Sequence, residues 1–542
     1  MSRKIWSPLL SLVLVLAVLL SACGTAEPTA APAPVSEPAA TAAPAPTEAP
    51  PPAEAPAAEP VIGVYAYPRT INELDPSLVL SSETNILWNV WGNLTLWDPD
   101  EGVVGMLAES WESNEDATVW TFRLREGVKC HDLTDLTAGA VKRSFERTIE
   151  KGALAYVYAP VDTIEAVDDA TVRITLNYPT RLPELLANNW GTFIMCPAAL
   201  DQPAEWFAAG NEVGAGPYMI ESYEPGQRLV LTKFDEWWQG WEEGSYDKII
   251  LEIVEDAAVR VQKLRGGEAD IAWSVPFDDF ESLNATGRIK ALAIPAFQQL
   301  QWHLNTRSAP LDDLRVRQAL AHAFPYDLAA QGTYGGYAVH ALGAVPRIQW
   351  TPATETRIYP YDLDTARALL EEAGLPRGTR LRLGVEVNAT EAIMVAQLWQ
   401  AELAKIGVAL NIEQISAGVR WDEVYNPDTQ FHIMFMHMFI GFDSPNEYLG
   451  SLWHSGWTWY PFSGFASEQF DALVEEALAS EAVDWDKADR LYQQAEQILY
   501  DEAVCVFALD LPQDWAIASD MVGFKPNPLY GYAAFLWQVR RE

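Results

Sequence analysis

The sequence predicts an α/β protein that contains more than one β-sheet. Stretches with the period of a helix alternate with strand-like stretches through the second half of the chain. The strand-like stretch 431–440 is apolar at odd and even positions alike, which is typical of a strand covered on both faces, and 504–511 is also continuously apolar. With 542 residues, 49% of them hydrophobic, the chain can bury two or three separate cores.

The N-terminus has the layout of an export signal. Arg3 and Lys4 precede an apolar run at 9–20, which is too short to cross a membrane comfortably, and small residues follow it up to Cys23. The tetrapeptide 20–23, Leu-Ser-Ala-Cys, resembles the lipobox of bacterial lipoproteins. That resemblance implies a signal peptide at 1–22 and a lipid on Cys23. The alternative is an ordinary secretory signal with a chance cysteine.

A segment that cannot form a core follows the signal. Residues 23–60 are rich in Pro and Ala, and most of the others are Glu or Thr, a composition that favours extended polyproline geometry. We expect it to act as a tether between a lipid anchor and a folded body at 61–542. No later stretch is long and apolar enough to be a transmembrane helix.

The first half of the body reads as short strands and helices separated by turns. Asp168-Asp169 and 224–227 are expected to be hairpin turns, and Thr137 is expected to cap a helix that ends before Gly152. The predicted strands are 61–67, 118–124, 217–223, 228–234, 248–254 and 269–275, and the predicted helices are 82–94, 137–149 and 256–265.

From residue 299 onward the elements are longer and alternate more regularly. This change in pattern predicts a boundary near residue 299. The predicted helices are 311–324, 363–373, 390–405, 467–479 and 483–500, and the predicted strands are 381–387, 408–415, 431–440 and 504–511.

The segment 431–452 predicts a strand, a short loop and a helix. Gly441 interrupts the apolar run, and Ser444, Pro445 and Glu447 have the spacing of a capping box with proline at the first helical position. In open α/β sheets, ligands bind outside the carboxyl ends of strands. The loop 441–443 is therefore the first place where we expect a ligand.

Beyond Cys23 the chain has three cysteines. Cys505 lies in an apolar run and is expected to be buried. In an oxidising compartment at most one pair can bridge, and Cys130 with Cys196 is a candidate whose pairing stays open.

Charge and residue spacing exclude several functions. The net charge of −39 would repel phosphate backbones and anionic lipid, so nucleic acid is not an expected partner. His432 and His437 lie five apart on a strand and point to opposite faces, and no metal-site spacing occurs, so neither a metal nor a cofactor is expected. The sequence shows no nucleophile elbow or zinc-protease motif, so no catalytic residues are expected.

An ordered set of motifs resembles the solute-binding proteins of ABC transporters, in the dipeptide/oligopeptide/nickel group called family 5. The motifs span about 450 residues in the order expected for that family. They are Leu74-Asp75-Pro76, LAESW at 107–111, LREGVKC at 124–130, GAGPY at 214–218, the tripeptide 246–248, and the runs 256–264, 267–271 and 316–323.

This resemblance implies a two-lobed, periplasmic-binding-protein-like fold of class II with a hinge and three subdomains. Subdomain I would comprise 61–98, 214–298 and 508–542, subdomain II 99–213, and subdomain III 299–507. It also implies a receptor, not an enzyme, that works outside the cytoplasm, in the periplasm or on the outer face of the cell membrane. A monomer would enclose a peptide or small molecule between its lobes and deliver it to a permease and its ATPase subunits, with the N-terminal lipid as the only membrane contact.

The resemblance also indicates site residues. Peptide-binding relatives carry a segment like WGADYPDP, whose first Asp pairs with the peptide amine; in this sequence that Asp falls on Gly441 and the Trp on Met438. Asp443 could supply a carboxylate instead, or could simply form a turn. Trp421 matches a cleft tryptophan. Other aromatic candidates are Phe439 and Phe442, which could stack on a ring or sugar, and Trp453, Trp457 and Trp459, which could form the floor of the cleft.

For several of these residues the alternative is ordinary packing. Trp421 and Phe439 could be core aromatics, and core packing is the safer interpretation of Met438. The missing amine anchor leaves two other functions to weigh against peptide binding. One is an oligosaccharide receptor of the same fold, which the aromatic richness suits. The other is an exported glycan hydrolase that uses paired carboxylates, although no pair stands out.

Overall fold

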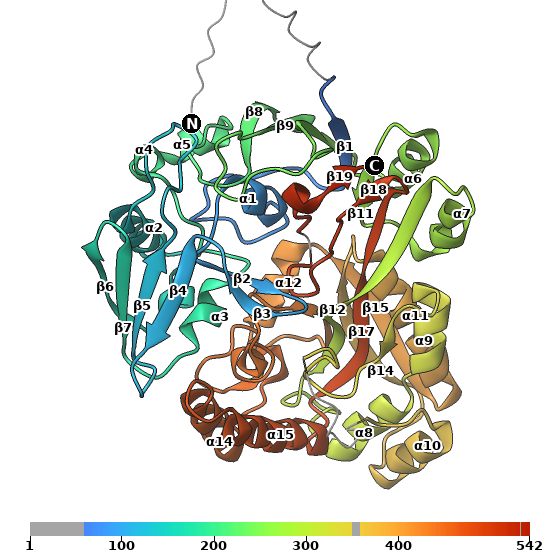
Figure 1. Ribbon diagram of the computed structural model, residues 1–542. Coiled ribbons are helices and arrows are strands. Elements are labelled where there is room, and N and C mark those ends of the chain that lie inside the picture. Colours follow the sequence, from blue (N-terminus) through green and yellow to red (C-terminus); the bar gives the residue numbers. More distant parts are fainter. Residues whose placement is uncertain (1–58, 350–357, 532) are drawn as a thin grey trace, which may run out of the picture. The chain divides into compact units, whose positions relative to one another are not determined.

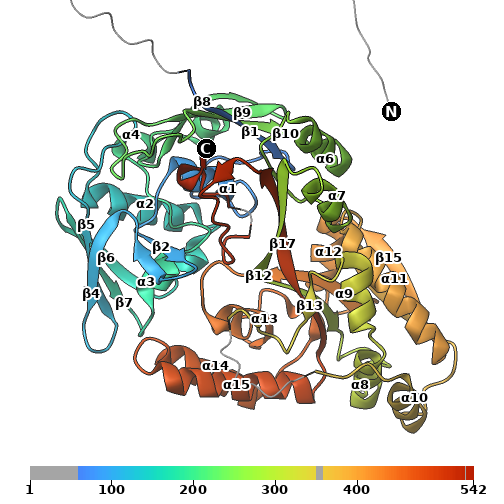
Figure 2. The same ribbon diagram turned by 45° about the vertical axis from the view of Figure 1, so that its right-hand side comes forward.

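Two long strands, β12 (Ile289–Leu304) and β17 (Cys505–Ala518), pair antiparallel at the centre of the largest sheet. The computed structural model describes residues 59–349, 358–531 and 533–542, which belong to one compact unit that begins at Glu59. The predicted signal peptide and almost all of the tether, including Cys23, lie outside the described residues. Figures 1 and 2 show β12 and β17 running through the middle of this unit.

The largest sheet has the strand order β15-β14-β16-β12-β17-β11-β1-β10-β9-β8, and β13 (Val339–His340) also pairs with β17. Strands from the first half of the chain lie on one side of the central pair and strands from the second half on the other. The first group is β1 (Ile62–Tyr67), β8 (Tyr218–Glu224), β9 (Arg228–Lys233), β10 (Lys248–Ile253) and β11 (Ile271–Trp273). The second group is β14 (Thr379–Glu386), β15 (Val408–Ile415) and β16 (Ile433–Phe439).

Several elements have the bounds or caps that the sequence predicted. Thr137 caps α2 with its side chain and Gly152 ends it at a φ of 82°, and α11 and β15 have the predicted bounds. The first half contains α1 (Thr84–Val90), α2 (Ala138–Lys151), α3 (Leu182–Leu186), α4 (Pro197–Leu200), α5 (Ala204–Ala208), α6 (Ala257–Gly266) and α7 (Phe280–Asn284). The second half contains α8 (Leu314–His322), α9 (Tyr326–Tyr334), α10 (Leu363–Glu372), α11 (Thr390–Lys405), α12 (Ala417–Val424), α13 (Gly450–Trp453), α14 (Glu468–Ser480) and α15 (Trp485–Asp501). Among the described residues, no helix is both long and apolar enough to cross a membrane.

A separate four-stranded antiparallel sheet lies at the left of Figure 1, with the order β4-β5-β7-β6. Its strands are β4 (Ala108–Ser113), β5 (Val119–Leu124), β6 (Val161–Asp168) and β7 (Thr171–Leu176), and the ribbon β2 (Thr95–Asp98) with β3 (Gly102–Gly105) precedes it. Cys130 and Cys196 form a disulfide in this region, with Cα atoms 6.0 Å apart. The pairing that the sequence left open is therefore present, and Cys505 is free and buried as predicted.

Strand β16 is covered on both faces, which confirms the prediction from its two-sided apolar pattern. Met434, Met436 and Met438 belong to the larger hydrophobic core, whereas Ile433 and Phe435 belong to a second core that includes residues of α8, α9, α10 and α11. The strand pairs parallel with β14 and antiparallel with β12, so its surroundings are those of a mixed sheet. Burial from both sides is what the apolar run encoded.

The sequence analysis did not predict strand β12, because polar side chains interrupt its apolar pattern. These residues are buried and bond to one another: Gln299 donates to Asp510 over 3.0 Å, and Gln301 donates to Gln299 over 2.7 Å. His303 contacts Gln301 at 2.9 Å. Partners two residues apart on one strand face satisfy each other's polar groups, so the strand can remain buried.

The helix predicted after Ser444 is broken into two short turns. Ser444 caps a 3₁₀ turn at Pro445–Glu447, and α13 follows only at Gly450. The hydroxyl of Ser444 also donates to Glu481, while Glu447 lies 3.5 Å from the backbone nitrogen of Gly441 and 3.4 Å from the Ser451 hydroxyl. Because Glu447 bonds forward and across the loop, the reciprocal capping box is not formed.

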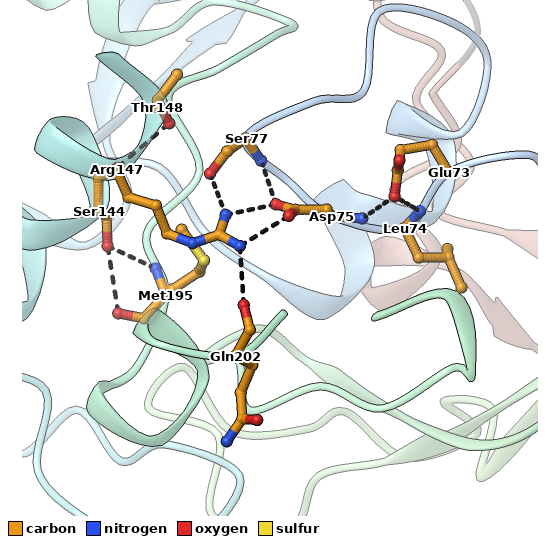
Figure 3. A network of polar contacts seen from close by, with 9 residues as sticks. All are labelled: Glu73, Leu74, Asp75, Ser77, Ser144, Arg147, Thr148, Met195 and Gln202. Atoms are coloured by element: carbon orange, nitrogen blue, oxygen red, sulfur yellow. Dashed lines mark hydrogen bonds and ion pairs between the residues drawn. The ribbon is translucent and has the colours of Figure 1, made fainter. Parts of the chain in front are cut away.

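A buried ion pair joins α2 to the segment that follows β1 (Figure 3). The two guanidinium nitrogens of Arg147 lie 2.6 and 2.7 Å from the two carboxylate oxygens of Asp75, which is fully buried. Arg147 also donates to the Ser77 hydroxyl over 2.6 Å, and Asp75 accepts from the Ser77 backbone over 3.0 Å. Asp75 belongs to the Leu-Asp-Pro motif, so this motif positions the region of the four-stranded sheet.

Candidate functional site

A cavity of about 410 Å³ lies against the central strands of the largest sheet. Its walls come from both sides of the central pair: Trp273 and Phe277 from the β11 side, and Trp421 and Trp459 from the second half of the chain. Tyr334, Phe435 and Phe439 are further aromatic residues in the lining. A volume of this size with several aromatic side chains and a few polar groups in its walls is typical of a site that encloses a small organic ligand.

Strand periodicity places three side chains of β16 in the cavity wall. Phe435, His437 and Phe439 alternate with the methionines of the larger core, of which Met436 also contributes to the cavity lining. His437 contacts the side chain of Gln298 at 3.2 Å. Burial, together with the nearby charge of Arg69, lowers the pKa of His437 to about 4, so the ring is neutral at pH 7.

An ion pair, whose two opposite charges neutralise each other, forms part of the cavity wall. Nε of Arg420 lies 2.6 Å from Oε1 of Glu386, and the guanidinium lies 4.3 Å from the ring centroid of Trp421. Arg420 also donates to the hydroxyl of Tyr460 over 3.4 Å. These contacts hold the plane of Trp421 at the cavity, where its ring lies 6.0 Å from that of Trp459.

Three other charged side chains line the cavity: Arg69, Glu391 and Asp514. Arg69 lies 5.5 Å from the ring centroid of Trp273. Burial and the negative charge of Glu391 together raise the pKa of Asp514 to about 8, and the positive charge of Arg260 partly opposes this rise. The cavity therefore carries acidic and basic groups that the Arg420–Glu386 pair does not neutralise.

The structure separates the predicted site residues into two groups. Trp421 and Phe439 line the cavity, as does Trp459, whereas Met438 points into the larger core and is 2% exposed. Phe442 is partly buried against the same core. Trp453 is buried and stacked on His303, and Trp457 is stacked on His454.

Gly441 and Asp443 lie in a loop that contacts the region of β2 and α3. The backbone nitrogen of Asn189 donates to the carbonyl of Gly441 over 2.8 Å, and Arg181 donates to the carbonyl of Asp443 over 3.3 Å. A methyl group on Gly441 would lie 2.5 Å from Oδ1 of Asn188, so only glycine fits there. Both carboxylate oxygens of Asp443 accept hydrogen bonds, from Trp97 over 3.2 Å and from Gln349 over 2.9 Å.

The sequence analysis missed most of the charged lining. Glu391 is in the first turn of α11, and Asp514 interrupts the apolar strand β17. A carboxylate in the middle of a strand that is otherwise largely apolar is unusual, and that signal could have marked Asp514 as a candidate. Among the described residues, no group of three or more His, Cys, Asp or Glu side chains has the geometry of a metal site.

Known proteins resemble this chain over almost the whole described body. Residues 102–460 match the family model described as bacterial extracellular solute-binding proteins, family 5 Middle. The probable D,D-dipeptide-binding periplasmic protein DdpA of Escherichia coli is 28% identical over 482 residues, covering 86% of this chain and 92% of that protein. The glutathione-binding protein GsiB of Escherichia coli is 28% identical over 487 residues, covering 88% of this chain and 94% of that protein.

The fold agrees with this match. The crystal structure of NikA from Brucella suis in complex with Fe(III)-EDTA superposes with a TM-score of 0.80, at 20% identity, and the alignment covers 89% of this chain and all of that one. The predicted two-lobed, periplasmic-binding-protein-like α/β fold is thereby confirmed. The chain belongs to the bacterial extracellular solute-binding proteins of family 5.

Proposed function

We propose that this protein is the extracytoplasmic receptor of an ABC importer, which captures a small peptide or a similar zwitterionic solute and delivers it to a permease and its ATPase subunits. The proposal rests mainly on the cavity of about 410 Å³ and its aromatic residues. The lining also contains the basic residue Arg69 and the acidic residues Glu391 and Asp514. A peptide carries one charge of each sign and apolar side chains between them. The names of the two Escherichia coli relatives, which bind a D,D-dipeptide and glutathione, support the same solute class.

The division into subdomains belongs to this proposal. The proposed borders at 298/299 and 507/508 fall within β12 and β17, the strands that pair at the centre of the sheet. These strands are the connections that would bend when the lobes open and close, with subdomain I formed by 61–98, 214–298 and 508–542. Subdomains II (99–213) and III (299–507) would move relative to each other about them.

We also propose how the protein is attached to the membrane and that it does not convert its solute. Cys23 would carry the lipid that anchors a monomer to the cell membrane, and 23–60 would be the tether; both support delivery to a membrane permease. The receptor would release its solute unchanged. A hydrolase would instead convert a candidate glycan, so mass spectrometry of the bound solute before and after incubation separates the two functions.

Ligand-dependent stabilisation tests the proposal. A ligand at one hundred times its Kd adds about 2.7 kcal/mol to the unfolding free energy, which scanning fluorimetry detects easily. We expect the purified full chain to be stabilised by dipeptides or glutathione. Trp421→Ala should abolish most of the shift, and Trp457→Ala, which removes an indole outside the cavity, should preserve it.

Oligosaccharides form the second arm of the same assay, because the rings of Trp421 and Trp459 in the cavity wall suit stacking on sugar faces. Stabilisation by oligosaccharides alone would replace the peptide assignment. No stabilisation by peptides, sugars or organic acids would contradict a small-solute receptor.

A further inference from the structure

The carboxyl of Asp514 occupies a distinctive place in the cavity. Asp514 lies in the middle of β17, opposite Ala293 of β12, and is half-buried in the cavity wall. Glu391, at the start of α11, lies close enough to influence it electrostatically, although the two residues are more than one hundred positions apart in the chain. We propose that Asp514, with Glu391 beside it, binds a positively charged nitrogen of the solute, an ammonium or guanidinium group; the inference rests on the proposed receptor function.

The nearby basic side chains do not neutralise Asp514. Within the described part of the chain, no Lys, Arg or His nitrogen forms an ion pair with its carboxylate. Arg260 acts on Asp514 electrostatically, but its guanidinium donates to the backbone carbonyls of Val254 and Glu255, both over 2.8 Å, and to that of Ser274. Two arginines line the cavity: Arg420 is paired with Glu386, and the guanidinium of Arg69 lies 5.5 Å from the ring centroid of Trp273.

The groups around Asp514 suit a cation. The pKa of the Tyr334 phenol is raised by burial and by the charges of Glu391 and Asp514, which places the phenol near both carboxyls. Trp273 and Phe277 also line the cavity, and the ring centroid of Phe277 lies 5.9 Å from that of Tyr334. Carboxylates combined with aromatic faces form the environment in which buried ammonium groups are bound.

The loop after β16 does not itself offer a free carboxylate for a positively charged nitrogen of the solute. The resemblance to peptide-binding relatives puts an amine-binding Asp at position 441, where this chain has Gly441 in contact with Asn188. The carboxylate two residues on, Asp443, already accepts hydrogen bonds from Trp97 and Gln349. Asp514 therefore supplies from β17 the negative charge that the loop lacks.

Binding should release a proton. The titratable groups that interact with Asp514 are Glu391 on α11, Arg260 on α6, Tyr334 on α9 and Tyr65 on β1. Burial and the negative charge of Glu391 raise the pKa of Asp514 to about 8 in the unliganded protein, although Arg260 opposes this rise. Most of the carboxyl is then protonated at pH 7. A bound cation favours the carboxylate, so most of one proton should leave when the solute binds.

The test uses the purified full chain and two probe mixtures: a library of unmodified dipeptides and the same library after N-acetylation. Native mass spectrometry measures capture, and titration calorimetry in two buffers of different ionisation enthalpy measures proton release. We expect the wild type to capture dipeptides from the unmodified library only. Asp514→Asn should weaken capture at least about tenfold and abolish proton release, and Glu391→Gln should weaken capture less.

Asp278→Asn is the matched control, because it removes an exposed carboxylate that follows Phe277 but does not line the cavity. It should bind as the wild type does. Equal capture of acetylated dipeptides, or unchanged affinity in both Asp514→Asn and Glu391→Gln, would overturn the inference and leave the receptor function standing. No capture from either library, with oligosaccharides also unbound, would overturn the proposed function and the inference together.

Discussion

The indole N–H of Trp97 donates a hydrogen bond to Oδ2 of Asp443 over 3.2 Å, and this contact joins β2 to the loop after β16 across 346 positions of the chain. Gln349 donates to the other oxygen of the same carboxyl over 2.9 Å. Burial raises the pKa of Asp443, and its hydrogen bonds from Gln349 and Trp97 partly offset this effect. The loop that the sequence marked as a ligand site thus holds distant parts of the chain together.

Removing the Asp443 carboxyl should destabilise the protein. In Asp443→Ala, the indole of Trp97 and the amide of Gln349 lose their acceptor, which costs about 1–3 kcal/mol of unfolding free energy. Asp443→Asn retains one acceptor oxygen and should cost less. Urea unfolding measures both variants, and equal stability of Asp443→Ala and the wild type would show that the contact contributes nothing.

Gly441→Ala should be harmful because of space rather than backbone conformation. The new methyl group would lie 2.5 Å from Oδ1 of Asn188 and 2.9 Å from the ring of Trp190. Overpacking of this kind costs about 1–3 kcal/mol. Gly418→Ala is the control, because nothing lies within 4 Å of its Cβ position in α12, and it should be neutral or slightly stabilising. Equal thermal stability of the two variants would contradict this explanation.

Breaking the buried Arg147–Asp75 pair should have a larger effect than any of these. Arg147→Ala would leave a fully buried carboxylate without its cation, at a cost of about 3–5 kcal/mol. The exposed pair Lys129–Asp135 provides the comparison, and Lys129→Ala should cost less than about 1 kcal/mol. Chemical denaturation measures both, and similar losses in the two variants would contradict the importance of burial.

Stability should fall as the pH rises through the titration of Glu447. Burial raises the pKa of its carboxyl from 4.5 to about 7, so the folded protein binds this proton more tightly than the unfolded chain does. The folded state is therefore favoured while Glu447 is protonated, and this advantage is lost between about pH 4.5 and pH 7. The loss amounts to about 1–3 kcal/mol.

Glu447→Gln isolates this contribution, because glutamine is neutral at every pH. Between about pH 5 and pH 8 the variant should lose less stability than the wild type does. Parallel curves of unfolding free energy against pH for the two proteins would rule out Glu447 as the titrating group.

Local patterns predicted much of the secondary structure. The bounds of α11 and β15 and the caps of α2 agree with the sequence, because period and capping depend on neighbours a few residues apart. The two-sided burial of β16 was readable for the same reason. Strand β12 was harder to predict. It stays buried because the polar groups of Gln299, Gln301 and His303 form hydrogen bonds with one another, whereas each polar residue considered alone argues against a buried strand.

The amino-acid sequence by itself determined the α/β class, the bounds of several elements, the family motifs and the absence of an aspartate at position 441. Only the tertiary structure decided which side chains meet at the cavity. Gly441 is in contact with Asn188, and the cavity brings together Tyr334, Glu391 and Asp514 from α9, α11 and β17. Periodicity reports which face of an element is buried, but the partner across that face is chosen by the packing of the whole chain, so the charged lining of the site had no local signature.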